Sequence, residues 1–336
     1  MSKRLDIVEE KFLNTIKENN LIDKNDVIVV GVSGGPDSMT LLHLLNKYKK
    51  IFEIRIIVAH INHLIREDST DDEQFVENYC KKNDIVFYKK RVKVEEIAKK
   101  EKKGTEEIGR IIRYNFFDEI LEKEKANKIA IAHNMNDNAE TMLLNLIRGA
   151  GLSGLEGIQP KRNEKYIRPL IYCKREEIEN YCKINELNPR IDSTNKQNIY
   201  KRNIIRNELL PFLKELNPNI VETLSRTSII ARKNNEFIKE QVNIFYEKVA
   251  INDDNQIKIN AKEFNKLADI IKEGIILKAI EELTGTIKNV EKSNVDDVIK
   301  LAKNNVGNKN IFFNKNIKAS ILKGILTIES LKKVIK

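Results

Sequence analysis

Short apolar runs alternate with helical segments through the first half of this chain, and this order constrains its fold most. A continuous apolar run such as VIVVGV is typical of a parallel strand buried on both faces. The repeated strand–helix order predicts an α/β fold with a doubly wound parallel sheet, whose ligands bind beyond the carboxyl ends of the strands. The expected strands are residues 27–32, 54–60, 85–92 and 128–133, and the expected helices are residues 37–48, 69–82, 105–125 and 136–148.

This pattern ends at the glycine-rich run Gly149–Gly157, which we interpret as a loop. Helical spacing dominates afterwards, before two or three short strands in the tail. We therefore predict a first domain over residues 1–215 and a mainly helical second domain with a strand-rich tail over residues 216–336. The later helices are expected near residues 174–187, 200–213, 218–248, 261–282 and 294–303.

Composition narrows the class of protein. Hydrophobic residues make up 41% of the 336 residues, enough for a packed core. No apolar run approaches the roughly 18 residues of a membrane span. The N-terminus is expected to form an amphipathic helix and lacks the apolar centre of a secretory signal, so we expect a cytoplasmic protein with no membrane contact. Cys80, Cys173 and Cys182 form no C-x-x-C pair, which argues against a zinc ribbon, a cluster or a disulfide framework. The net charge of +10 fits nucleic-acid binding and, equally, a bias toward Lys, Asn and Ile.

The most specific feature is VIVVGVSGGPDS, in which a buried strand leads through Ser33–Ser38 into a helix. Gly34 and Gly35 let the backbone approach a ligand and adopt positive φ. The helix N-terminus offers free N–H groups and a positive dipole to an anion such as phosphate. Asp37 would repel a phosphate unless a cation bridges the two, so we predict Mg²⁺ at Asp37.

This loop is neither a Walker A motif nor G-x-G-x-x-G. It resembles the S-G-G-x-D-S loop of the N-type ATP pyrophosphatases, the PP-loop superfamily, which cleave ATP between the α and β phosphates. The resemblance implies an adenine-nucleotide α-hydrolase-like fold. It also assigns ATP binding to six consecutive residues, Ser33, Gly34, Gly35, Pro36, Asp37 and Ser38.

Further segments narrow the resemblance to the tRNA(Ile)-lysidine synthetase family. They are residues 59–68, 104–117, 131–155, 168–170 and 190–213. The resemblance implies a ligase that adenylates the wobble cytidine of tRNA(Ile) with anticodon CAU at its C2 carbonyl. Free L-lysine then displaces AMP to give lysidine. The resemblance also implies that residues 216–336 contact the tRNA body through phosphates, and it leaves a homodimer open.

A helix near the fourth strand carries a candidate substrate site. Asp137 and Glu140 lie three residues apart and share a helical face. The resemblance implies that they bind lysine, with Asp137 also catalytic as a proton acceptor. Carboxylates at this place could instead hold Mg²⁺ or stabilise the helix N-terminus. His133 ends the strand and either contacts nucleotide or RNA phosphate or is structural.

Three arginines complete the predicted site. Arg113 could reach the target cytidine or a phosphate, or form a surface ion pair with Glu107 or Asp118. Arg202 and Arg206 lie one helical turn apart, with Arg202 assigned to substrate. Arg206 matches an arginine of the family and is expected to be catalytic by neutralising pyrophosphate. The alternative for Arg206, and still more for Lys201, is a solvated cationic face.

Some positions depart from the family pattern. Asn134 stands where the family usually has a second histidine, and Asn136 and Asn138 stand where it often has Asp and Gln. Asp192 and Asn195 are expected to shape the loop before Arg202, because both residue types favour turns.

Two other functions remain open. A PP-loop tRNA thiolase would activate the base in the same way and deliver sulfur, typically with paired active-site cysteines or a cluster. The three cysteines here are scattered. A non-catalytic RNA-binding protein with a relic nucleotide site would have no need of the intact Ser33, Asp37, Ser38, Asp137 and Glu140.

Overall fold

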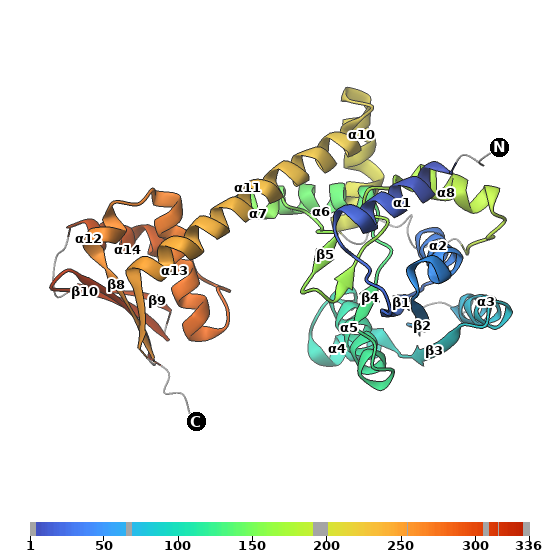
Figure 1. The fold of residues 1–336 in the computed structure, drawn as a ribbon, viewed down its shortest axis with the longest axis horizontal. Coiled ribbons are helices and arrows are strands. Elements are labelled where there is room, and N and C mark those ends of the chain that lie inside the picture. Colours follow the sequence, from blue (N-terminus) through green and yellow to red (C-terminus); the bar gives the residue numbers. More distant parts are fainter. Residues whose placement is uncertain are drawn as a thin grey trace. The chain divides into compact units, whose positions relative to one another are not determined.

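The chain divides into two compact units, Met1–Ile230 and Ala231–Lys336. Helix α11 (Ile220–Val249) runs through the division (Figure 1). The domain boundary predicted between residues 215 and 216 precedes this helix and stays a prediction. The computed structural model describes residues 5–64, 69–190, 201–253, 255–304, 309–314 and 316–331.

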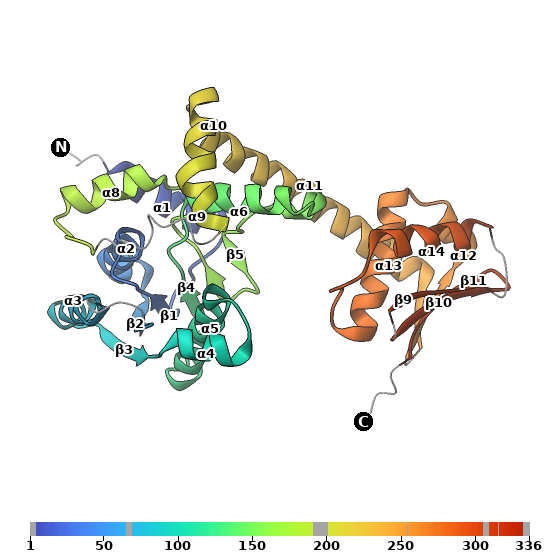
Figure 2. The same cartoon turned by 180° about the vertical axis from the view of Figure 1, so that it is seen from behind.

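A six-stranded sheet forms the centre of the first unit, with the order β3-β2-β1-β4-β6-β5 (Figure 2). Its neighbouring strands are parallel except for the antiparallel pair β5 and β6. The predicted parallel-sheet α/β fold is therefore confirmed. The strands are β1 (Val27–Gly31), β2 (Arg55–Asn62), β3 (Val86–Arg91), β4 (Lys128–Ala130), β5 (Lys161–Arg162) and β6 (Tyr166–Ile167).

The helices of this unit lie between and after the strands, as the alternating pattern predicts. Two were not predicted: α4, and the single turn α7 inside the expected glycine-rich loop. Among the described residues, no helix combines the length and the apolar character that crossing a membrane requires. The helices are α1 (Ile7–Glu18), α2 (Pro36–Phe52), α3 (Ser69–Lys82), α4 (Val94–Glu101), α5 (Thr105–Lys123), α6 (Met135–Ile147), α7 (Gly151–Gly154), α8 (Arg175–Ile184), α9 (Lys201–Ile204), the π-helix η2 (Ile205–Leu209) and α10 (Leu210–Leu216).

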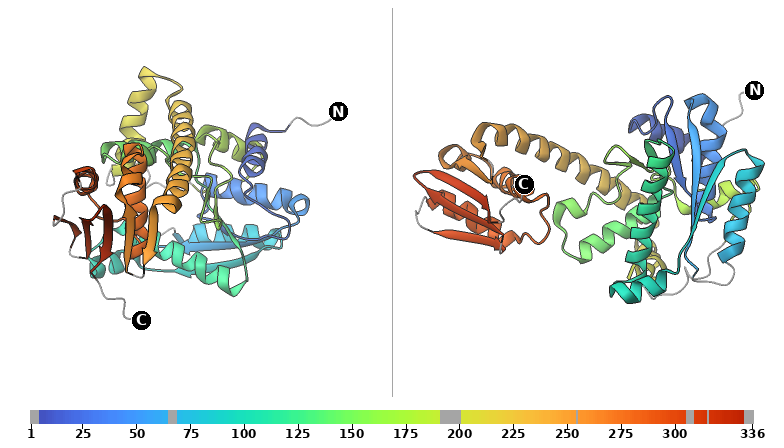
Figure 3. Two further views of the ribbon diagram at one scale, coloured as in Figure 1. Left: turned by 60° about the vertical axis from the view of Figure 1, so that its left-hand side comes forward. Right: turned by 90° about the horizontal axis from the view of Figure 1, so that it is seen from below.

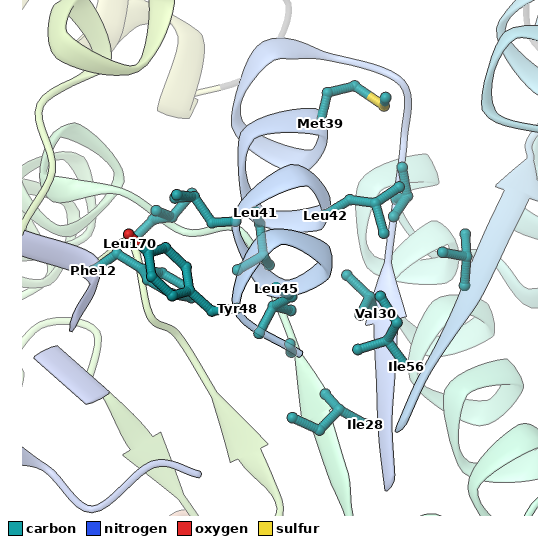
Figure 4. Close-up of a cluster of buried hydrophobic side chains, with 14 of the residues drawn as sticks. Phe12, Ile28, Val30, Met39, Leu41, Leu42, Leu45, Tyr48, Ile56 and Leu170 are labelled. Atoms are coloured by element: carbon teal, nitrogen blue, oxygen red, sulfur yellow. The ribbon is translucent and has the colours of Figure 1, made fainter. Parts of the chain in front are cut away.

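Both faces of the sheet are buried, and alternate residues of each strand serve opposite faces. Ile28 and Val30 of β1 join the core formed with α1, α2 and α8 (Figure 4), whereas Val29 joins the core against α5. Successive side chains of a strand point to opposite faces, so a strand covered on both sides must be apolar throughout. The unbroken run VIVV is thus explained by helices packing on each side.

The strand order creates a switch point at the centre of the sheet. β1 pairs with β2 on one side and with β4 on the other. The chain runs outward through β2 and β3 and then returns to β4 across β1. The loops after β1 and β4 therefore leave in different directions and open a crevice at the carboxyl edge, where ligands bind in such sheets. The Ser33–Ser38 loop and His133 follow these two strands.

The second unit is built on a separate five-stranded antiparallel sheet, ordered β7-β8-β11-β10-β9 (Figure 3, orange and red). Its helices and strands share one apolar core. The tail strands were predicted, but the hairpin β7–β8 was missed because QIKIN offers only two alternating apolar positions. The elements after α11 are β7 (Ala250–Asp253), β8 (Gln256–Asn260), α12 (Ala261–Asn265), α13 (Asp269–Thr284), α14 (Lys292–Asn304), β9 (Asn310–Asn314), β10 (Ile317–Leu322) and β11 (Ile325–Ser330).

The contact between β1 and α5 gives a test of this packing. A Cβ added to Gly31 would lie 2.5 Å from Cζ of Phe117, whose ring is buried in the core and cannot swing away. We expect Gly31→Ala to lower the free energy of unfolding by about 1–3 kcal/mol, the usual cost of overpacking. Urea unfolding followed by circular dichroism measures it.

Gly109, inside α5, is the matched control. A Cβ there would meet its nearest neighbour, in His63, at an ordinary contact distance of 3.7 Å. Because alanine favours a helix over glycine by up to about 1 kcal/mol, Gly109→Ala should stabilise the same unit. Equal effects of the two substitutions would contradict this account of the packing.

Candidate functional site

The Ser33–Ser38 loop is held in shape by its own hydroxyl groups. Oγ of Ser38 donates to the carbonyl of Gly35 at 3.0 Å and accepts from the backbone N–H of Ser33 at 3.2 Å. Gly35 is the N-cap of α2, and Pro36 follows at the first turn. Gly34 has φ +93°, as predicted, whereas Gly35 has φ −77°, so the positive φ expected there is wrong. The loop presents the start of a helix of 17 residues, which suits an anion.

Asp37 projects from this helix start toward the loop after β4. Its Oδ1 accepts a hydrogen bond of 2.8 Å from the side chain of Asn134. Burial and the nearby charge of Asp137 raise the pKa of Asp37 to about 6, although Arg175 and Arg206 oppose the rise. The negative charge of Asp37 is therefore unfavourable at this buried position, and a cation bound there would stabilise it.

Asn134 and Asp137 together fix the start of α6. The Asn134 side chain accepts from the backbone N–H of Asp137, and Oδ2 of Asp137 accepts from the N–H of Asn134, both at 3.0 Å. This reciprocal arrangement is a capping box. The alternative that Asp137 stabilises a helix N-terminus is therefore correct for one carboxylate oxygen. The other oxygen faces the arginines described next.

Arg202 and Arg206 converge on the two acids of α6. The Nη2 atoms of Arg202 and Arg206 lie 3.1 and 3.2 Å from Oδ1 of Asp137. Their Nε atoms bind separate oxygens of Glu140, which is fully buried, at 2.8 and 2.6 Å. Arg175 adds a longer contact of 3.7 Å to Asp137. The alternative of a solvated cationic face is wrong for Arg206, whereas Lys201 is exposed.

Among the described residues, this ion cluster is electrically balanced. Three carboxylates, those of Asp37, Asp137 and Glu140, lie near three guanidinium groups. Arg206 comes from the π-helix η2, a form often found at functional sites. A ligand that brings negative charge to the arginines would leave the two α6 acids available to a cation.

His133 lies just beyond β4 and is electrically neutral. Burial and four surrounding arginines, Arg168, Arg202, Arg110 and Arg113, hold its pKa well below the usual value. Its Nδ1 accepts a hydrogen bond of 3.2 Å from Nε of Arg168. The ring proton therefore lies on Nε2, which makes His133 a hydrogen-bond donor at the carboxyl edge of the sheet.

Arg113 is exposed and forms neither of the ion pairs considered for it. Among the described residues, Asp118 instead binds Lys165 at 2.7 Å and the hydroxyl of Tyr166 at 3.2 Å. Arg113 is close enough to His63 to help lower the pKa of that histidine, after burial, to about 4. Its guanidinium group remains available to a ligand.

The three asparagines that depart from the family pattern have structural contacts. Besides Asn134, Asn136 accepts from the backbone N–H of Arg175 at 3.0 Å. Asn138 binds the N–H of Ile158 at 2.6 Å and the hydroxyl of Ser228 at 3.0 Å.

Two of the site's residues, Asn134 and Arg175, were not predicted from the sequence to take part in it. The sequence N-x-x-D, an N-cap asparagine followed three residues later by an acid, could have identified Asn134 as a cap. No local signal pointed to Arg175. The predicted turn residues Asp192 and Asn195 lie outside the described residues.

A cavity of about 200 Å³ opens beside the ion cluster. Arg175 lies in its wall and also reaches toward Asp137, so cavity and cluster share a residue. The lining carries both signs of charge, which suits an amino acid with an ammonium and a carboxylate. The lining residues are Asn136, Lys174, Arg175, Glu176, Glu179, Lys214, Pro218, Val221 and Glu222.

The cysteines are poorly suited to sulfur chemistry. All three are buried and free. Burial raises the pKa of Cys80 and of Cys173 to about 12 and also raises that of Cys182. The reactive form of cysteine is the thiolate, which thiols in such surroundings do not provide at neutral pH.

The donor set at Asp37 fits Mg²⁺ only together with a phosphate. No group of three or more His, Cys, Asp or Glu side chains suited to a metal occurs within the described ranges. Mg²⁺ is commonly held by one or two carboxylates plus substrate phosphates. Asp37, at the start of the helix expected to bind the phosphates, matches that requirement.

Comparisons with known proteins agree with this geometry. The profile of the PP-loop domain family matches residues 5–213. A tRNA(Ile)-lysidine synthase of Clostridium acetobutylicum is 44% identical over 309 residues, which are 91% of this chain and 67% of that protein. One of Clostridioides difficile is 41% identical over 93% of this chain and 68% of its own length. One of Petrotoga mobilis is 40% identical over 74% and 78%.

This chain spans about two thirds of the length of the first two of these relatives. Among solved structures, the U34-tRNA thiolase NcsA from Methanococcus maripaludis, with its [4Fe-4S] cluster, aligns with a TM-score of 0.55. Its sequence is 20% identical, and the alignment covers 67% of this chain and 78% of that one. At this identity the likeness shows a shared fold.

The raised pKa of Asp37 predicts a specific pH dependence of stability. An unfolded aspartate titrates near 4, whereas Asp37 in the folded chain titrates at about 6. Between these values the folded chain holds a proton that the unfolded chain has lost, so Asp37 makes folding less favourable as the pH rises from about 4 to about 6. Asp37→Asn should remove this contribution and be more stable than the parent at pH 7.

Urea unfolding from pH 4 to pH 7.5 tests this. Asparagine keeps an oxygen for the bond from Asn134, so the substitution changes mainly the charge. Glu95→Gln, on an exposed side chain of α4, is the control and should leave the profile unchanged. Superimposable profiles for Asp37→Asn and its parent would contradict the burial argument.

Proposed function

Because this chain belongs to the PP-loop family of ATP-binding domains and, within it, to the tRNA(Ile)-lysidine synthases, we propose that it is an ATP-dependent ligase that joins free L-lysine to the wobble cytidine of tRNA(Ile) with anticodon CAU. The observation that carries the proposal is the balanced ion cluster beside the phosphate loop. It offers arginines to phosphates and acids to an ammonium group at one place.

The first step proposed is adenylation of the base. The C2 carbonyl oxygen of the cytidine attacks the α-phosphorus of ATP, the bond to the β-phosphate oxygen breaks, and pyrophosphate leaves. The N-terminus of α2 and the hydroxyls of Ser33 and Ser38 would bind the phosphates. Arg206 would neutralise the departing pyrophosphate. Asp37 would hold Mg²⁺, which offsets phosphate charge when it is bound.

The second step proposed is attack by lysine. Its ε-amine bonds to C2 of the cytidine, the bond from C2 to the adenylate oxygen breaks, and AMP leaves. As Arg202 and Arg206 turn toward the phosphates, Asp137 and Glu140 become free to hold the ammonium group. Asp137 would accept the proton that the amine loses. The cavity beside Arg175 has charges of both signs for the amino-acid end of lysine.

The proposal includes the wider setting of the reaction. The second unit would contact the tRNA body through phosphates, in keeping with a net charge of +10 for the whole chain. Since the substrates are tRNA, ATP and free lysine, we propose that the enzyme acts in the cytoplasm.

Incorporation of labelled lysine tests the reaction. The chain would be mixed with ATP, Mg²⁺, labelled lysine and an unmodified tRNA(Ile) transcript with a CAU anticodon, and in parallel with a methionine tRNA transcript of the same anticodon. We expect ATP-dependent label in the isoleucine transcript alone. Pyrophosphate release without label would reject lysine as the nucleophile, and label in both would reject discrimination between the tRNAs.

The buried cysteines separate this function from thiolation. Replacing Cys80, Cys173 and Cys182 together by serine should leave lysine incorporation per folded molecule within about twofold, because none of these thiols is accessible as a thiolate. The fraction of folded protein is measured by circular dichroism. Complete loss of activity in a folded variant would point to sulfur chemistry instead.

A further inference from the structure

Four arginines of the first unit gather around His133 and Tyr114, and we call them the arginine cluster: Arg110, Arg113, Arg162 and Arg168. Arg110 and Arg113 come from α5, and Arg162 comes from β5. Arg168 follows β6. Only Arg113 among them was expected to touch a substrate.

Arg168 is buried without an acid partner. Its side chain is 4% exposed. Nε donates to Nδ1 of His133 at 3.2 Å, and Nη1 donates to the carbonyl of Gln159 at 2.6 Å. Within the part of the chain that the structure describes, no carboxylate forms an ion pair with it. A buried charge without a counter-charge is unfavourable, so a site of this kind gains from an anion.

Arg110 and Arg162 both lie against the ring of Tyr114. Their guanidinium carbons are 5.3 and 5.4 Å from the ring centre. Arg162 also lies 4.8 Å from the ring centre of Tyr166, and its buried Nε has no hydrogen-bond partner among the described residues. Aromatic rings can hold guanidinium groups in place while leaving their N–H donors free.

The histidine between these arginines adds another donor. Because Nδ1 of His133 accepts from Arg168, its Nε2 carries the proton. The arginines and the Nε2 of His133 thus offer donors to a ligand. The ion cluster around Asp137 and Glu140, in contrast, contains as many carboxylates as guanidinium groups among the described residues.

We propose that the arginine cluster binds a backbone phosphodiester of the substrate RNA beside the nucleotide that reacts. A phosphodiester offers only acceptors, and the planar fork of a guanidinium group matches its oxygens. This inference rests on the proposed function, in which RNA is the substrate.

The alternative source of such a phosphate is ATP. The N-terminus of α2 and the arginines of the ion cluster already provide for the nucleotide's phosphates. Arg110 and Arg113 are exposed, as contact with a long polymer requires. These observations favour RNA over ATP as the ligand of the arginine cluster, and the binding of each can be measured.

Binding of a tRNA(Ile) transcript to the full chain, measured by fluorescence anisotropy at several salt concentrations, tests the proposal. Arg110→Ala and Arg113→Ala should each weaken binding roughly tenfold at about 0.1 M salt, as loss of one charge-assisted contact does. Each should also make the dependence of affinity on salt shallower, by a slope of about 0.7–0.9. ATP binding, measured with a fluorescent analogue, should stay within about twofold.

Lys50→Ala is the matched control, because it removes an exposed cation in the last turn of α2. That end of the helix lies at the opposite edge of the sheet from the phosphate loop. Its RNA affinity and salt slope should equal those of the parent. Arg110→Lys keeps the charge without the planar fork and should give an intermediate affinity with an unchanged slope.

The outcomes separate this inference from the proposed function. Parent-like RNA affinity in both alanine variants, with lysine still incorporated, would overturn the arginine cluster as an RNA site and leave the function standing. Weakened ATP binding with unchanged RNA binding would assign the cluster to the nucleotide and overturn the proposal. Failure of the parent chain to bind RNA would overturn both. Circular dichroism confirms that each variant is folded.

Discussion

The fully buried carboxylate of Glu140 is the constraint on which the site depends. Taking it out of water is costly unless it is paired, and leaving such a charge without its partner typically costs about 3–5 kcal/mol. Arg202 and Arg206 pair with it, and both come from the segment α9–η2, far along the chain from α6. These ion pairs with Glu140 therefore hold the segment α9–η2 at the carboxyl edge of the sheet. Arg206 lies in the π-helical turn directly after the short helix that carries Arg202, and both arginines contact Asp137 and Glu140.

A second constraint links the two loops of the switch point. Asn134 caps α6 with its side-chain oxygen and binds Asp37 with its side-chain nitrogen. One amide thereby fixes the distance between the phosphate loop after β1 and the acids after β4. The family's usual histidine also carries one acceptor and one donor, but on two ring nitrogens, so it would bridge these groups with a different geometry. The departure from the family pattern is thus a local solution to the same positioning problem.

The sequence predicts the catalytic unit well because its signals are local. The apolar run VIVVGV predicts that β1 is buried on both faces. The glycines that follow it predict a loop at the start of a helix. Positive φ at Gly34 follows from that chemistry, but Gly35 takes an ordinary φ because it caps α2. The pairing of Glu140 with Arg202 and Arg206 could not be read locally, since it depends on how residues more than sixty positions apart meet. The hairpin β7–β8 is local but was missed because the short run QIKIN has only two alternating apolar positions.

The distribution of charge suggests an order for the proposed reaction. In the ion cluster, acids and arginines satisfy one another, so a lysine ammonium group would gain little by entering while the arginines remain. Phosphates that attract Arg202 and Arg206 would release the acids and raise the affinity for lysine. Thermodynamic linkage makes this reciprocal, so bound lysine would also favour bound phosphates. Within the described parts of the chain, no carboxylate forms an ion pair with the arginine cluster, so it would accept RNA without first losing one. The site would thus bind RNA independently of lysine, whereas the binding of lysine would be coupled to that of the nucleotide. This coupling would bring the amine into place when the base is activated and so limit its reaction with other groups.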